Sequence, residues 1–229
     1  SVVWMREVGS VATVDDVLTC VATGGALLAA GGQITGAIPT WGTRSIYSDA
    51  VEDRQLAIVY IMSAHDGTED WAKAFGTDTT DGTAVVASVA VHVTTDGIAD
   101  GIVVAGSFTG GNLVVDDEVL DAPEDAPLAQ TGFVVMLDAE TGAVRWARRA
   151  TTVGGVPSSQ AFSTVSSVDA SAAAVAVAGS FIYPGTGRLA FEQSMLVEGV
   201  ASNEDVEHGY VAVFDATTGA SLSVTVPQC

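Results

Sequence analysis

The amino-acid sequence repeats itself about every 75 residues, and this period restricts the folds that the chain can adopt. The clearest copy is Phe133 to Trp146, FVVMLDAETGAVRW, in which an apolar run precedes turn residues and a second segment that ends on tryptophan. Related segments are Ala57 to Trp71 and Tyr210 to Ser223. A repeat of this length predicts a supersecondary unit that buries its apolar face against neighbouring copies of itself.

A second motif keeps the same period. The segment IVVAGSFTG, Ile102 to Gly110, matches Val175 to Gly185, and Gly106 lies 73 residues before Gly179. The segment Leu27 to Gly36 is a weaker first copy, in which Gly31 aligns with Gly106. Each copy contains four apolar segments of strand length, bounded by turn residues. The predicted fold class is therefore all-β: three four-stranded antiparallel β-propeller blades plus a stray outer strand, as part of a larger propeller.

We predict a single repeat domain over residues 1–229, with blades at about 11–76, 84–150 and 161–226. Residues 1–8 are predicted to be the outer strand of a neighbouring blade, because Trp4-Met5-Arg6 resembles the tryptophan-containing ends of the first and second copies. The predicted strands are Val11–Leu18, Ala26–Ile34, Gln55–Ser63, Glu69–Phe75, Ala84–Val93, Gly101–Phe108, Phe133–Leu137, Val144–Arg148, Ser163–Val168, Ala173–Ile182, Gly209–Phe214 and Ser221–Val226.

Long insertions separate the second and third strands of every copy, at Thr35–Arg54, Thr109–Thr131 and Tyr183–His208. Small hairpins are predicted within two of them, at Asn112–Leu120 and Gly187–Val197. Insertions at one position of each repeat emerge on one face, so we expect them to crowd together and to form a binding surface. The candidate binding residues are acidic: Asp116, Asp117, Glu118, Asp121, Glu124, Asp125, Glu204, Asp205 and Glu207.

The charge balance restricts the partners. The chain has 8 lysine and arginine residues against 28 aspartate and glutamate residues, which gives a net charge of −20. This excess disfavours nucleic acids and anionic lipid surfaces as partners. It suits a protein that faces cations outside the cell, so an extracellular or cell-surface location is expected. No apolar run reaches the length of a membrane-spanning helix.

Cysteines and histidines form no recognisable metal or catalytic motif. Cys20 and Cys229 are far apart in sequence, and either a disulfide between them or a bond of Cys229 to another segment remains open. The histidines at positions 65, 92 and 208 are isolated and are expected at exposed or turn positions. Residues 78–83 and Asp116-Asp117-Glu118 offer oxygen ligands for calcium, but they lack EF-hand spacing and are expected to be solvated turns. No catalytic residue, metal site or cofactor is predicted.

The segment from Asp138 through Thr141-Gly142 to Trp146 resembles the signature of quinoprotein-like (PQQ-type) β-propeller repeats. The third copy keeps Asp215, Thr218 and Gly219 but has Ser223 in place of the tryptophan. The VAGSF strand followed by FVVMLD is also similar to propeller repeats of surface proteins. The resemblance implies that each tryptophan docks between neighbouring blades and caps the turn of the next blade. It assigns structural roles to Trp4, Trp71, Trp146, Gly106, Gly142, Gly179 and Gly219.

The resemblance does not extend to catalysis, because the quinone-dependent dehydrogenases of that family use adjacent cysteines and this chain has none. We therefore expect a non-enzymatic acidic propeller module that acts as a structural or interaction scaffold. Its long acidic loops would face a protein or glycan partner, or another subunit would close the propeller. The alternative is a quinone-dependent dehydrogenase whose active site is completed by blades outside this segment.

Overall fold

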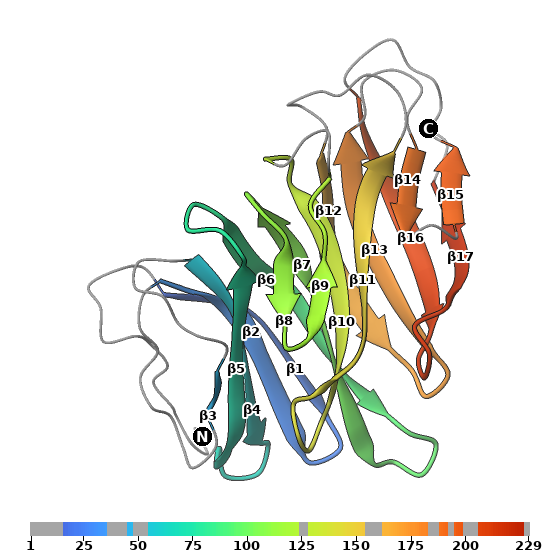
Figure 1. Cartoon of the computed structure of the whole chain (residues 1–229). Coiled ribbons are helices and arrows are strands. Elements are labelled where there is room, and N and C mark those ends of the chain that lie inside the picture. Colours follow the sequence, from blue (N-terminus) through green and yellow to red (C-terminus); the bar gives the residue numbers. More distant parts are fainter. Residues whose placement is uncertain are drawn as a thin grey trace.

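The computed structural model describes residues 16–35, 45–47, 55–123, 128–153, 162–182, 188–191, 195–198 and 206–226. These residues form strands and turns, and no helix occurs among them. The predicted all-β class is confirmed. Figure 1 shows the strands side by side in a curled array that runs from the first repeat to the third.

The first repeat is an antiparallel meander of four strands. Its order is β1 (Val17–Gly24), β2 (Leu27–Thr35), β4 (Gln55–Ser63) and β5 (Glu69–Thr77). Strand β4 has the predicted bounds, and it is buried along almost its whole length because it carries an unbroken apolar run. Strand β1 continues to Gly24, six residues beyond the predicted end, because the turn falls at Gly25, which has a positive φ of 58°.

The second and third repeats pair their strands in the same antiparallel order. A bridge between Gln55 and Thr83 links the first and second repeats within a 13-stranded sheet, whereas the four meander strands of the third repeat form a separate 4-stranded sheet. The second repeat consists of β6 (Thr83–Val93), β7 (Ala99–Thr109), β10 (Thr131–Asp138) and β11 (Val144–Val153). The third consists of β12 (Phe162–Ala170), β13 (Ala174–Ile182), β16 (Glu207–Asp215) and β17 (Ser221–Thr225).

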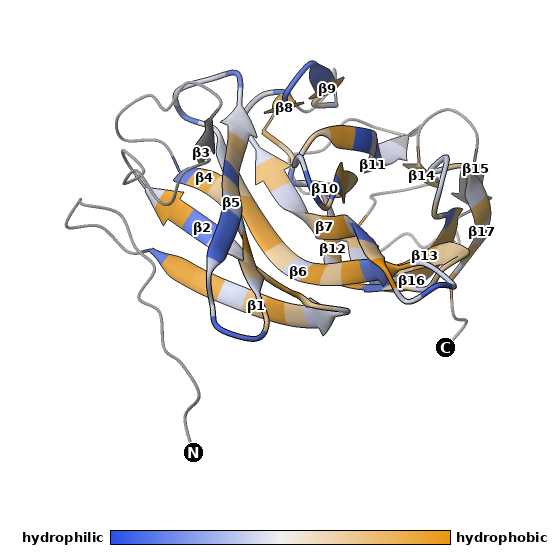
Figure 2. Cartoon of the chain, turned by 90° about the horizontal axis from the view of Figure 1, so that it is seen from below, coloured by the Kyte–Doolittle hydropathy of each residue, from blue (hydrophilic) through white to orange (hydrophobic). Residues whose placement is uncertain are grey.

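The insertions contain the two predicted hairpins, β8 (Leu113–Val115) with β9 (Glu118–Leu120), and β14 (Arg188–Phe191) with β15 (Met195–Glu198). Strand β8 pairs with the end of β5, and β14 pairs with the end of β11. Each hairpin thus pairs alongside the end of the last strand of the preceding repeat. The expectation that the insertions crowd together is wrong for these hairpins, which lie apart in Figures 1 and 2. The first insertion adds an unpredicted strand, β3 (Ser45–Tyr47), parallel to β5.

A β-bulge recurs in the first strand of every repeat, where the strand pairing skips Thr19, Ala87 and Ser166. Opposite each bulge the second strand carries a glycine. A Cβ on this glycine would lie 1.9 Å from a carbonyl oxygen of the first strand. The equivalent glycines are Gly32, Gly106 and Gly179. The alignment of Gly31 with Gly106 is therefore corrected by one residue, because the strand pairing and not the local sequence sets the register.

The core lies mainly at the junctions between repeats. One buried cluster joins the first and second repeats, and the Phe75 and Phe133 rings meet edge to face within it, 5.8 Å apart. Another joins the second and third repeats, where the Trp146 and Phe214 ring centroids lie 6.1 Å apart. Figure 2 shows mostly apolar residues along the strands and hydrophilic residues at the turns. Each repeat thus buries its faces against its neighbours, as expected for units that are not stable alone.

Replacement of Gly179 by alanine is expected to destabilise the chain by more than about 2 kcal/mol, because the added Cβ would overlap the Thr164 carbonyl oxygen. The matched control is Gly209→Ala on the neighbouring strand β16, where the nearest atom would be 3.9 Å away. This control should change the free energy of unfolding by less than about 0.5 kcal/mol. Urea unfolding of both variants measures the difference, and equal losses would contradict the register described above.

Candidate functional site

The turn between the last two strands has the same construction in the second and third repeats. Oδ1 of Asp138 accepts hydrogen bonds from the backbone N–H of Thr141, at 2.9 Å, and from its hydroxyl, at 2.8 Å. Asp215 accepts the same two bonds from Thr218. The side chain of an aspartate in this position stabilises the turn because it accepts hydrogen bonds from the backbone of the turn. The glycine that follows supplies the positive φ. Gly142 and Gly219 have φ angles of 71° and 66°.

A tryptophan of the preceding repeat covers each of these turns. The indole N–H of Trp71 on β5 donates to the Ala139 carbonyl at 2.8 Å, and that of Trp146 on β11 donates to the Ala216 carbonyl at 3.0 Å. Both tryptophans are buried. These contacts place the two residues between neighbouring repeats.

A cation two residues after each tryptophan binds the same turn. Nζ of Lys73 donates to the Gly142 carbonyl at 2.8 Å, and Nε of Arg148 donates to the Gly219 carbonyl at 2.9 Å. Lys73 is only 2% exposed, and its second partner is the Asp116 carboxylate at 2.5 Å. The third repeat has Ser223 and Thr225 at the equivalent positions, and both are exposed. The docking residues are therefore present on β5 and β11 and absent from β17.

An ionic network in the second repeat contacts the third repeat through His92. Nδ1 of His92 lies 2.5 Å from Oδ1 of Asp100, and Nε2 of His92 lies 3.4 Å from the Ala172 carbonyl oxygen of the third repeat. Arg145 bridges the carboxylates of Asp100 and Asp138 at 3.0 and 2.9 Å. Partial burial acts to raise the pKa of Asp138, but hydrogen bonds from Arg145 and Thr141 outweigh it and lower that pKa to about 2.

The prediction that all three histidines are isolated is therefore wrong for His92, which is 5% exposed and bound to a carboxylate. The hairpin between β6 and β7 brings Asp100 beside it across the strand pair. His208 contacts the Phe181 ring, with ring centroids 5.5 Å apart. His65 is exposed in the turn between β4 and β5, as expected.

The junction between the first and second repeats contains a groove. This groove of about 650 Å³ lies beside Trp71. At this junction Asp70 stands immediately before Trp71, whereas in the next repeat Arg145 stands immediately before Trp146. The carbonyl oxygen of Ala26 accepts a hydrogen bond from a backbone N–H of the turn, and the carbonyl oxygen of Asp100 accepts the equivalent hydrogen bond in the next repeat. Small or acidic residues thus replace members of the ionic network, and a cavity remains.

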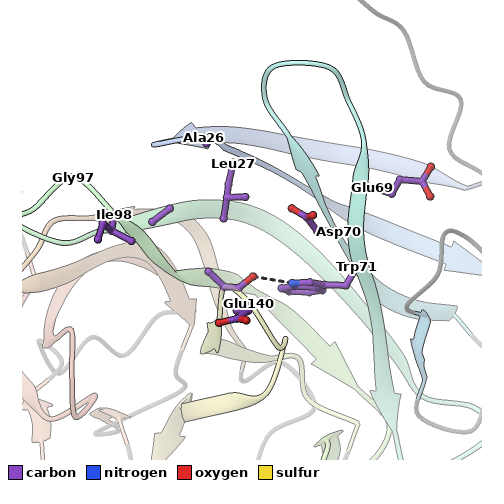
Figure 3. Close-up of a pocket in the computed structure, with 10 residues that line it drawn as sticks. Ala26, Leu27, Glu69, Asp70, Trp71, Gly97, Ile98 and Glu140 are labelled. Atoms are coloured by element: carbon purple, nitrogen blue, oxygen red, sulfur yellow. Dashed lines mark hydrogen bonds between the residues drawn. The ribbon is translucent and has the colours of Figure 1, made fainter.

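The groove combines apolar surface with carboxylates. Figure 3 shows Leu27 and Ile98 on one side of the Trp71 indole and Asp70 next to it on β5. Ile98 is 63% exposed, which is high for so large an apolar side chain. Glu69, Asp70 and Glu140 supply three carboxylates, and among the described residues that line the groove there is no arginine or lysine. This arrangement favours a ligand that offers positive charge together with an apolar stem.

The structure places the predicted acidic residues only in part. Asp116 forms the turn between β8 and β9 with a φ of 55°, and its ion pair with Lys73 connects this hairpin to the Gly142 turn. Asp117, Glu118 and Asp121 are exposed around the hairpin, and Glu207 is exposed at the start of β16. The remaining candidates Glu124, Asp125, Glu204 and Asp205 lie outside the described residues, as do Trp4 and Cys229.

The two segments considered for calcium have protein partners in the structure. Both carboxylate oxygens of Asp78 accept hydrogen bonds from Asn112, and Asp116 binds Lys73. Among the described residues, no group of three or more histidine, cysteine, aspartate or glutamate side chains is arranged to hold a metal ion. In the same part of the chain no helix is long and apolar enough to span a membrane.

Two comparisons with known proteins complete this description. No protein-family model matches the chain. No curated protein matches it significantly either.

Replacement of Trp71 or Trp146 by phenylalanine is expected to cost about 1–3 kcal/mol, because the turn carbonyl of Ala139 or Ala216 would lose its buried donor. The matched control is Ser223→Phe, which places the same ring at the equivalent exposed position of β17. We expect this control to change stability by less than about 0.5 kcal/mol. Denaturant unfolding provides the measurement.

Arg145→Leu is expected to raise the pKa of Asp138 from about 2, because the hydrogen bond and the charge of the guanidinium are lost. Since the folded-state pKa of Asp138 lies below the unfolded value near 3.9, its stabilising effect is present above about pH 4 and disappears as the pH falls towards 2. The variant should therefore show a shallower loss of stability over this pH range.

Carboxyl-carbon NMR titration measures the Asp138 midpoint directly. Asp215 is the internal control, because its pKa is lowered by hydrogen bonds from Thr218 and involves no arginine. A variant in which both midpoints stay in place would show that Arg145 does not control the Asp138 carboxyl group.

Proposed function

We propose that each repeat is a blade of a β-propeller of the quinoprotein-like type and that the chain is a non-enzymatic scaffold that binds a partner protein. The proposal that each repeat is a blade rests on the contacts between repeats, which have the same construction at both junctions. Trp71 and Trp146 each donate to a turn carbonyl of the next repeat, and a cation two residues later binds the same turn. This arrangement supports stacking of successive meanders in one direction, as blades require.

The groove at the first junction supports the binding role. At the position of the second repeat that corresponds to Asp70, Arg145 is bound to Asp100 and Asp138, whereas Asp70 lines the groove. Ile98 is a large apolar side chain that is 63% exposed beside this groove, and it has no packing role there that would explain its exposure. Concave sites with apolar walls and a few polar groups are the usual form of binding sites.

The partner that best fits is a basic segment of a protein. Lysine and arginine side chains have long apolar stems and a terminal charge, which match Leu27 and Ile98 beside Asp70 and Glu140. The net charge of −20 would steer such a segment towards the chain and speed its association. The exposed carboxylates of the β8–β9 hairpin lie on the adjoining turn and extend the acidic surface.

Neutralisation of the groove by Asp70→Asn with Glu140→Gln should weaken binding of a synthetic lysine- and arginine-rich peptide about three- to tenfold. Each exposed charge pair contributes about 0.2–1 kcal/mol, so two pairs account for this range. Isothermal titration at 0.15 M salt measures the affinity, since low salt would exaggerate contacts that depend on total charge alone.

The control pair Asp81→Asn with Asp169→Asn removes the same total charge at exposed positions that do not line the groove. We expect it to leave the affinity unchanged. Equal weakening by both pairs would mean that the peptide responds only to net charge, and the groove would then not be a binding site. A second variant, Asp117→Asn with Glu118→Gln, tests the contribution of the hairpin in the same assay.

A further inference from the structure

The β-bulge in the first strand of each repeat fixes which residues of these strands are equivalent. Two positions after the skipped residue, the three strands carry Val21, Val89 and Val168. Val89 and Val168 are 5% and 8% exposed, and each belongs to a buried cluster shared with the preceding repeat. Val21 is 65% exposed, and Leu18 on the same strand is also exposed, whereas its equivalents are buried valines. We refer to Leu18 and Val21 as the projecting surface.

At the first junction, the preceding repeat receives these valines on a residue without a side chain. A Cβ added to Gly31 would lie 2.6 Å from a methyl carbon of Val86 and 2.8 Å from one of Val89, so both valines lie directly on this glycine. The backbone of Val89 is also hydrogen-bonded to the thiol of Cys20, which stands opposite Gly31 in the strand pair.

The second junction has the same construction. The backbone N–H of Val168 donates a hydrogen bond to the Ser88 hydroxyl at 3.2 Å. Ser88 stands at the position of Cys20, and Ala105 stands at the position of Gly31. Ala105 belongs to the same buried cluster as Val168. Each junction therefore joins an apolar residue of the following repeat to a small residue and a short hydrogen-bonding side chain of the preceding repeat.

The third repeat has the receiving residues, and they are not covered. They are Ser167 and Ala178, which we call the receiving surface. Ser167 is exposed and Ala178 is half-buried, whereas the equivalent Ala105 is fully buried. On the neighbouring strand β16, Val211 is exposed although its equivalent Val134 is fully buried. The projecting and receiving surfaces belong to the first and third repeats, at opposite ends of the array (Figure 1).

A polar pair beside these surfaces is matched as well. Ala90 of the second repeat packs in the same buried cluster as Ala170 of the third repeat. The third repeat has Asp169 at the position of Ala90, and the first repeat has Thr23 at the position of Ala170; both are exposed. A hydroxyl donor and a carboxylate acceptor therefore replace the two alanines where these surfaces would meet, and a hydrogen bond between them would satisfy the carboxylate.

We propose that copies of this chain associate head to tail, with Val21 of one copy packed on Ala178 and Ser167 of the next. The backbone N–H of Val21 donates to the Ser167 hydroxyl, as in the second junction. Strand β1 (Val17–Gly24) contains no charged residue, so its approach brings no like charges together. The contact is confined to this strand, because other apolar residues of the first repeat form a cluster that is already buried. It does not depend on the partner proposed for the groove.

Sedimentation velocity of the intact chain tests the association. The contact is small, so we expect a dissociation constant weaker than about 1 μM and a sedimentation coefficient that rises between about 10 and 500 μM protein. Each copy carries a net charge of −20, so raising the salt concentration from about 0.05 to 0.5 M should strengthen the association by screening the repulsion. A chain that stays monomeric under all these conditions would overturn the proposal.

The variants Val21→Asp and Ser167→Asp alter the two surfaces separately. Both positions are exposed in a single chain, so each variant should fold, and urea unfolding verifies this. Each should weaken the association at least about tenfold, because the contact would bury an unpaired carboxylate. The control Leu128→Asp adds the same charge at a residue that is 79% exposed and belongs to neither surface. Equal weakening by all three variants would overturn the proposal.

A mixture of the two variants distinguishes a head-to-tail contact from one between identical surfaces. The Ser167→Asp variant keeps the projecting surface, and the Val21→Asp variant keeps the receiving surface. An equimolar mixture should therefore form a 1:1 complex, although each variant alone stays monomeric at the same total concentration. A mixture that remains monomeric while the unmodified chain associates would show that the two surfaces do not bind each other.

Discussion

The hydrogen bond from a tryptophan indole to the turn of the next repeat determines how the units of this chain are arranged. The donor lies on the last strand of one meander, and the acceptor lies in the turn before the last strand of the following meander. The bond therefore fixes both the spacing and the direction of stacking. The buried clusters on either side of the second repeat depend on that alignment, since their aromatic residues come from different repeats. A non-directional apolar contact alone would allow neighbouring meanders to slide, whereas a buried donor and acceptor permit one register.

The two junctions share this framework and differ in what surrounds it. Next to the second junction Arg145 binds the carboxylates of Asp100 and Asp138, and His92 binds Asp100. At the first junction carboxylates and small residues occupy the corresponding positions, and a groove remains. The residues that hold the repeats together are therefore the same at both junctions, while the residues around them differ. Such variation allows a repeat array to carry a local binding surface without losing its fold.

Much of the fold was predictable because its signals are local. The apolar run at Gln55–Ser63 and the aspartate and glycine of the following turns predicted strands and turns that the structure contains. The bulge in each first strand was not predictable, and it led to the misalignment of Gly31. The contact between Lys73 and Asp116 joins residues 43 apart, and no local pattern indicates it. The groove was missed for a related reason. It forms between two neighbouring repeats, at positions that lack the side chains of the ionic network.

The sequence by itself determined the all-β class, the repeat, the turn chemistry and the excess of acidic residues, because periodicity and composition act on neighbouring residues. The tertiary structure decided which side chains meet. It joined Lys73 to Asp116, enclosed His92 between two repeats, and separated the two hairpins that were expected to lie together. The physical reason is that each hairpin satisfies its open edge by pairing with the nearest exposed strand end, and the position of that end depends on how the repeats stack.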